Sequence, residues 1–289
     1  MTACPGPRPG RAVAHHGRVQ IDRVTRRRRF GRLGRRADTI GQRLMAVRRR
    51  LIGMERRPAA LISAAICLIP IVFVLVVPHP VEQAFGVDRD LYLGVTRRWL
   101  DGGPYFESYQ LAGPYLIRAG DVLYPPVALL LFVPFALGGA IGSVAWLVPP
   151  LAGTVACIAR LRPRPAAWPL LALCATNPTT LLKIWTGNPV IWSMLALAVA
   201  TISPRWRAAA PISLLKPSLA PFALFGANRR SWWAGLAVGA VVCVPFGAMW
   251  GDWVASIVNS RGGGLLYSAL EVPILALPLV AWLGRTRGG

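Results

Sequence analysis

The chain has 289 residues, of which 54% are hydrophobic and 15% are charged, and its formal net charge is +22. Soluble domains carry about 25% charged residues, so this composition excludes an ordinary soluble protein and predicts an all-α, polytopic integral membrane protein. Five cysteines without a CxxC pair and three histidines argue against a disulfide framework, a zinc site or a histidine-based metal site.

Residues 1–57 form a basic tail, which we expect to be disordered. They hold 17 of the 33 basic residues, including RRRR at 26–29, and three of the eleven acids. Such runs can bind nucleic acid or anionic lipid, but a cytoplasmic charge anchor, or a true start at Met45 or Met54, explains this one better. The positive-inside rule then places the N-terminus in the cytoplasm, and residues 58–289 form the membrane domain.

The membrane domain begins with residues 59–78, which contain one polar residue, Ser63, and no charge. A helix of about 20 residues, rising ~1.5 Å per residue, covers the ~30 Å core of a bilayer. The sequence predicts a bundle of about eight hydrophobic segments, and its arginine-rich composition indicates a bacterial plasma membrane. The seven later segments are 122–139, 141–159, 166–182, 188–203, 208–226, 232–250 and 264–283.

Two topologies fit these segments. Eight full spans leave Arg160–Arg164 and Arg205–Arg207 outside the cell, against the positive-inside rule. Two re-entrant or interfacial segments, such as 122–139 and 208–226, would bring every basic loop inside. Both topologies place the loop 79–121 on the extracytoplasmic side.

The loop 79–121 is the one long hydrophilic segment of the membrane domain. A connection of roughly 43 residues exceeds the usual length, so it is either functional or internally folded. Residues 91–100 have apolar positions at helical spacing and could lie along the membrane surface, before Asp101-Gly-Gly-Pro breaks the helix. Six of the eight acids beyond residue 57 lie in this loop: Glu82, Asp88, Asp90, Asp101, Glu107 and Asp121.

Short motifs occur in a fixed order from this loop onward. They are Asp90 with Tyr92, Gly-Gly-Pro-Tyr at 102–105, Tyr-Pro-Pro at 124–126, Thr-Gly-Asn-Pro at 186–189 and Leu-Lys-Pro at 215–217. Together they resemble glycosyltransferase family 87 over residues 59–250. Two features depart from the family: the Gln of its Gly-Gln-x-Asn pattern is missing, and the chain is shorter than typical members.

The resemblance implies the GT-C membrane fold and an inverting hexosyltransferase. Its donor would be a polyprenyl-phosphate sugar carrying mannose or a related sugar, and its acceptor an envelope lipid or glycan. Such an enzyme needs no cofactor and no metal, and its partners would be the bilayer and its two substrates rather than nucleic acid. Two alternatives stay open: a transporter or permease without chemistry, and a non-catalytic scaffold, which the missing Gln would favour.

A transferase of this kind must deprotonate an acceptor hydroxyl and stabilise the departing phosphate. A carboxylate suits the first task, and Arg or Lys the second. The resemblance implies that Asp90 is the base, with Asp88 as the alternative. Their Asp-x-Asp spacing also allows Mg²⁺ or Mn²⁺ to bind, which a lipid-phosphate donor does not require. Because residues two apart on a helix point apart, we expect only one of the two carboxylates to face a site.

The predicted contacts to the donor phosphate are Lys216, Lys183 and Arg118. Lys216 lies in the middle of an apolar segment, where an ionisable group is costly and therefore a functional candidate. Alternatively, Lys216 snorkels towards Arg229 and Arg230, and Lys183 serves as an interface anchor. The predicted substrate-binding residues are Tyr92, Tyr124 and Asn188.

Overall fold

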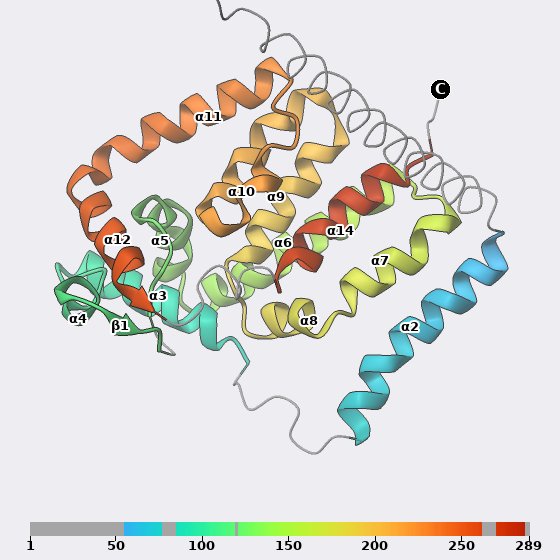
Figure 1. Cartoon of the computed structure of the whole chain (residues 1–289), viewed down its shortest axis with the longest axis horizontal. Coiled ribbons are helices and arrows are strands. Elements are labelled where there is room, and N and C mark those ends of the chain that lie inside the picture. The colour runs from blue at the N-terminus through green and yellow to red at the C-terminus, as the bar shows by residue number, and fades with distance from the viewer. Residues whose placement is uncertain (1–54, 77–84, 119–120, 262–269, 287–289) are drawn as a thin grey trace, which may run out of the picture. The chain divides into compact units, whose positions relative to one another are not determined.

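The computed structural model describes residues 55–76, 85–118, 121–261 and 270–286, and these are mostly helical, which confirms the all-α class (Figure 1). The chain divides into two units, Met1–Gly53 and Met54–Gly289. The expected basic tail, apart from its last three residues, lies outside the described residues, as do Met45 and Met54.

The elements follow one another in this order. The first part holds α2 (Arg56–Val76), α3 (Val87–Leu100), α4 (Ser108–Ala112), β1 (Tyr115–Leu116), the 3₁₀ helix η1 (Pro126–Ala128), α5 (Leu129–Leu137) and α6 (Gly139–Leu161). The middle holds η2 (Pro165–Ala167), α7 (Trp168–Ala175), α8 (Pro178–Trp185), α9 (Val190–Ile202), η3 (Pro204–Leu215), η4 (Pro217–Leu219) and α10 (Ala220–Ala223). The last part holds α11 (Arg230–Cys243), η5 (Val244–Phe246), α12 (Gly247–Asn259), β2 (Ser260–Arg261) and α14 (Val272–Leu283).

Within the described ranges, two stretches of helix are long and apolar enough to cross a membrane. They are α6, with 23 residues, and the 30-residue run Arg230–Asn259. The pair α8 and α9 would make a third span, but it is bent by 110°. The predicted bundle of about eight hydrophobic segments is therefore not confirmed by the described residues. Several of the expected segments form shorter helices that begin at proline, because proline is accepted in a first turn but not in a helix interior.

The centre of the described fold is α9. Most of its residues are buried, because the helix is apolar all round and packs against α6, α14 and η3. Trp146, Ile191, Leu197 and Ile274 are among the fully buried side chains of this core. By contrast, α11 carries exposed valines such as Val241, the pattern of a helix that faces lipid.

The basic loops lie together at one end of this fold, which we call the basic end. Pro163 pairs with Arg285, and the Arg162 carbonyl accepts a hydrogen bond from the Thr286 amide (3.3 Å). Ser231 Oγ donates to the Pro204 carbonyl (2.7 Å), which brings the loops 204–207 and 229–231 side by side. Clustered basic loops are the arrangement that the topology with re-entrant segments predicts.

The segment 204–229 enters from the basic end and returns to it. It starts at Pro204, reaches Lys216 after η3, and comes back through α10 to Arg229. On the returning limb, the Ala223 carbonyl accepts a hydrogen bond from Trp232 Nε1 of α11 (2.6 Å). The expected segment 208–226 thus forms short turns, because its prolines prevent one continuous helix, and its path is the one expected of a re-entrant segment.

The loop 79–121 is folded as far as it is described. Its helix α3 ends at Leu100, just before Asp101, as the sequence predicts, and its apolar face packs against α5. The position of α3 along the membrane surface stays a prediction. With nine residues, α5 rises only ~14 Å, so segment 122–139 does not form a full span. Further along, Tyr115 pairs with Ser260, which joins the loop to the end of α12.

Candidate functional site

The break between α8 and α9 organises the candidate site. Asn177 caps the start of α8 by accepting a hydrogen bond from the Thr179 amide (3.0 Å). The helix ends at Trp185, and Gly187, two residues later, has a φ of +69°, in the left-handed region that favours glycine. A Cβ at this position would lie 2.9 Å from the Arg89 Cβ, so glycine also allows α3 to approach closely. The Thr-Gly-Asn-Pro motif at 186–189 therefore does more than end a helix, because its Thr186 and Asn188 side chains converge on Asp88.

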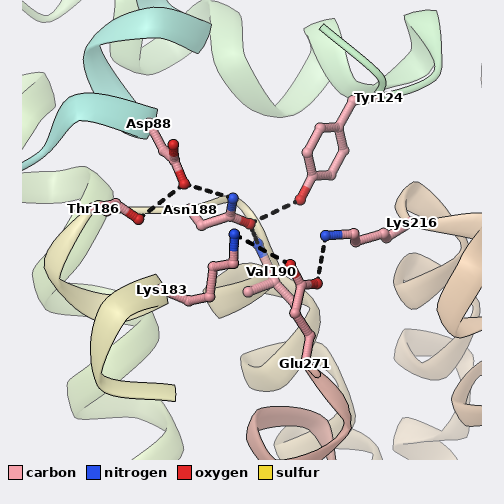
Figure 2. A network of polar contacts seen from close by, with 8 residues as sticks. All are labelled: Asp88, Tyr124, Lys183, Thr186, Asn188, Val190, Lys216 and Glu271. Atoms are coloured by element: carbon pink, nitrogen blue, oxygen red, sulfur yellow. Dashed lines mark hydrogen bonds and ion pairs between the residues drawn. The ribbon is translucent and has the colours of Figure 1, made fainter. Parts of the chain in front are cut away.

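Asp88 docks onto this break. Its Oδ2 atom accepts hydrogen bonds from Asn188 Nδ2 (2.7 Å) and Thr186 Oγ1 (2.9 Å), as Figure 2 shows. The backbone of α3 is held on the same turn, since the Arg89 amide donates to the Thr186 carbonyl (3.1 Å) and the Gly86 amide to the Trp185 carbonyl (2.9 Å). Asp88 also lies in the first turn of α3, where the helix dipole stabilises a negative charge.

Tyr124 closes the network on one side. Its hydroxyl donates to Asn188 Oδ1 (3.1 Å), which also accepts from the Val190 amide (3.1 Å). Because both the oxygen and the nitrogen of the Asn188 side-chain amide form hydrogen bonds, the network fixes the orientation of this amide. The Tyr124 ring packs edge-on against Tyr92, with centroids 5.1 Å apart, and Tyr92 packs against Phe132. Tyr92 thus supports Tyr124 within an aromatic cluster.

Two lysines and a glutamate form the other half of the network. Lys216 forms a hydrogen-bonded ion pair with Glu271 Oε2, and Lys183 Nζ lies 3.4 Å from Oε1 (Figure 2). The Glu271 side chain is fully buried, and 5% of the Lys183 side chain is exposed, so these charges depend on one another. Burial lowers the pKa of Lys216, which lies outside the candidate membrane-spanning helices, and the Glu271 carboxylate opposes this shift.

The two halves form one cluster of four charges. Figure 2 shows Asp88 and Glu271 on opposite sides of Asn188 and Lys183. Asp88 is close enough for its charge to favour the protonated form of Lys216. Two carboxylates thus balance two ammonium groups, and this pairing offsets part of the desolvation cost of burying the charges. A carboxylate that can take a proton beside ammonium groups that can hold an anion is suited to group transfer.

Asp90, the first candidate for the base, lies outside this cluster. Its side chain is 61% exposed and forms an ion pair with Arg89, whose Nε lies 2.7 Å from Oδ1. Only one of the two carboxylates faces the site, as expected, and it is Asp88. The Asp-x-Asp pair does not converge on one point, and no group of three or more His, Cys, Asp or Glu side chains in the described ranges could hold a metal ion.

Arg118, the third predicted phosphate contact, belongs to a different group. Its backbone amide donates to Asp121 Oδ2 (2.7 Å), and its guanidinium lies 5.1 Å from the centre of the Tyr109 ring. The Tyr109 hydroxyl donates to Asp121, and this hydrogen bond to a carboxylate raises the pKa of Tyr109 to about 12. The structure therefore brings together Lys183, Lys216, Asp88, Tyr124 and Asn188, but not Arg118.

Glu271 is the site residue that sequence reasoning missed. It is an acid at the start of an apolar helix, in the expected segment 264–283. The rule that singled out Lys216, the high cost of an ionisable group among apolar residues, applies to Glu271 as well.

The chain was compared with protein-family models, curated proteins and solved structures, and none of them matches it.

Proposed function

We propose that the chain is a GT-C-type membrane glycosyltransferase that moves mannose or a related sugar from a polyprenyl phosphate to an envelope lipid or glycan. The observation that carries the proposal is the convergence of Asp88 with two buried ammonium groups, Lys183 and Lys216, at a broken helix. The ordered motifs that resemble glycosyltransferase family 87 support it. In this proposal the basic end faces the cytoplasm of a bacterial cell, and the cluster is reached from the other side of the plasma membrane.

The reaction is a single displacement with inversion. The acceptor oxygen attacks the anomeric carbon, the bond from that carbon to the phosphate oxygen breaks, and the acceptor proton moves to a carboxylate. Asp88 takes the role of base, ahead of Asp90. The hydrogen bonds that described residues make to Asp88 all end on Oδ2, so Oδ1 is left for the acceptor hydroxyl.

The lysines would receive the leaving phosphate. Lys183 and Lys216 present two ammonium groups, and without substrate Glu271 neutralises them. When a phosphate enters, it shares these partners with Glu271, and its growing negative charge is stabilised most in the transition state. No step requires a metal. Tyr124 and Asn188 position Asp88 and the sugar.

A transporter or permease is the second candidate function. A helix broken by 110° beside buried charges is also the arrangement by which transporters bind ions and anionic substrates. A non-catalytic scaffold remains the third.

The test uses the purified full chain with labelled polyprenyl-phosphate sugars and a native lipid extract. Transfer of label to an acceptor lipid or glycan supports the enzyme. In parallel, proteoliposomes that enclose no acceptor are loaded with the same donors. Movement of donor across the bilayer, together with no transfer of label in the first assay, would refute the enzyme in favour of the transporter. If neither assay showed activity, the non-catalytic scaffold would be the remaining candidate. Asp252→Asn, on the exposed side of α12, is the matched control for the carboxylate variants.

A further inference from the structure

Arg207 is a buried cation at the basic end. Its residue is 8% exposed, and its Nη1 atom is buried without a hydrogen-bond partner. The guanidinium carbon lies 4.0 Å from the centre of the Phe225 ring and 5.4 Å from that of Trp282. These two rings meet edge to face, so Arg207 sits in an aromatic corner. Gly226, with φ of +91°, makes room for it, because a Cβ there would lie 2.4 Å from Arg207 Cδ.

Further positive charge surrounds this corner. Arg285 lies over the same Trp282 ring, 4.3 Å from its centre. Burial, together with the nearby charges of Arg285 and Arg229, lowers the pKa of Arg207. In the described part of the chain, the ion pairs involve Arg89, Arg98 and the two lysines, so no carboxylate there balances this group. Aromatic faces offset part of the cost of a buried guanidinium, but they do not bond its N–H groups.

We propose that Arg207 and Arg285, with Arg229, bind the phosphate of an anionic membrane phospholipid. Guanidinium groups are suited to phosphate because their planar N–H groups can bond two oxygens at once. A lipid is favoured over a free phosphate because large apolar side chains border the arginines on the surface. Trp206 is 57% exposed, Leu224 62% and Leu283 74%, and these would contact acyl chains.

The bound headgroup would join three parts of the fold. Arg207 lies on the outgoing limb of the re-entrant segment 204–229, Phe225 on its returning limb, and Trp282 and Arg285 at the end of α14. The same segment carries Lys216, and α14 begins next to Glu271. A lipid at the basic end therefore stabilises the two elements that hold the candidate site. The proposed lipid site does not depend on the proposed glycosyl transfer, so lipid binding and sugar transfer can be tested separately.

The experiment measures lipid binding to the purified full chain in detergent, by native mass spectrometry and by thermal unfolding. Phosphatidylglycerol is titrated against phosphatidylcholine with the same acyl chains, and inorganic phosphate is a third ligand. We expect phosphatidylglycerol to bind and to raise the Tm more than the other two, because ligands stabilise the state that binds them. Arg207→Gln and Arg285→Gln should each weaken phosphatidylglycerol binding by about tenfold or more, since each loses a charge-assisted contact.

The matched control is Arg205→Gln, which removes an exposed arginine two residues from Arg207 and should leave the affinity within about twofold. Arg285 is less buried than Arg207, so its variant keeps the test valid if Arg207→Gln does not fold. Equal stabilisation by the two lipids would overturn the proposal, as would unchanged affinity in both variants. Stabilisation by inorganic phosphate equal to that by phosphatidylglycerol would overturn the assignment to a lipid.

Discussion

Lys216 and Glu271, 55 positions apart in the sequence, form an ion pair that joins the end of η3 to the start of α14. Lys183 lies on the other oxygen of the same carboxylate. Glu271 is thus in direct contact with both lysines, whereas Asp88 acts on Lys216 through its charge, so the three side chains of this ion pair network do not have equal effects on stability.

We expect Glu271→Gln to cost more stability than Lys216→Met. The first change leaves two ammonium groups without the carboxylate that both of them contact, whereas the second leaves Lys183 still paired with Glu271. Removing one partner of a buried ion pair typically costs about 3–5 kcal/mol, and we expect Glu271→Gln to fall in that range. The measurement is thermal or denaturant unfolding in detergent. A larger loss in Lys216→Met than in Glu271→Gln would contradict this account of the charges.

Asp88→Asn should reduce sugar transfer by about 10²–10⁴-fold, the usual contribution of a general base, while Asp90→Asn should change it only a few-fold. Asn keeps the shape of Asp88 and can still accept one hydrogen bond from Thr186 or Asn188, so expression should remain close to wild type. Initial rates with a labelled donor measure the difference. If Asp90→Asn caused the large loss and Asp88→Asn did not, the base would be Asp90, as the family resemblance implies.

The Tyr109 hydroxyl should lose its proton at a higher pH than the hydroxyl of an ordinary tyrosine. Its hydrogen bond to Asp121 raises its pKa from 10.0 to about 12. Between these values the folded state holds a proton that the unfolded state has lost, so Tyr109 makes stability fall as the pH rises through this window. Asp121→Asn should return the pKa towards 10.0, as measured by ultraviolet absorbance of tyrosinate. Tyr109→Phe identifies the signal, and an unchanged titration in Asp121→Asn would show that the carboxylate is not the cause.

The two ends of the fold should lie on opposite sides of the membrane. In a variant without native cysteines, Ser108→Cys, in the exposed loop, should react with an impermeant thiol reagent on intact cells. Arg205→Cys, at the basic end, should react only after lysis, because basic loops stay in the cytoplasm. Labelling of both positions on intact cells, or the reverse pattern, would exclude the orientation on which the proposed function depends.

Much of the fold follows from local features of the sequence. Apolar segments of helical length predict a helical membrane protein, and the part of the chain that the structure describes has two helices that could cross a bilayer. The Asp-Gly-Gly-Pro motif at 101–104 likewise predicts that α3 ends where it does, after Leu100. These features can be predicted because helix breaking and the cost of a charge in lipid act at each position separately.

Only the tertiary structure decided which groups meet. Asp88 and Asp90 have similar surroundings in the sequence, and the docking of α3 on the break at Gly187 turns Asp88 inward and leaves Asp90 on Arg89. Hydropathy likewise shows that Lys216 is costly to bury, but it cannot identify Glu271 as its partner. It also cannot tell a re-entrant segment from a span, since both are apolar. Pairing over long distances depends on how helices pack, and no local pattern records that.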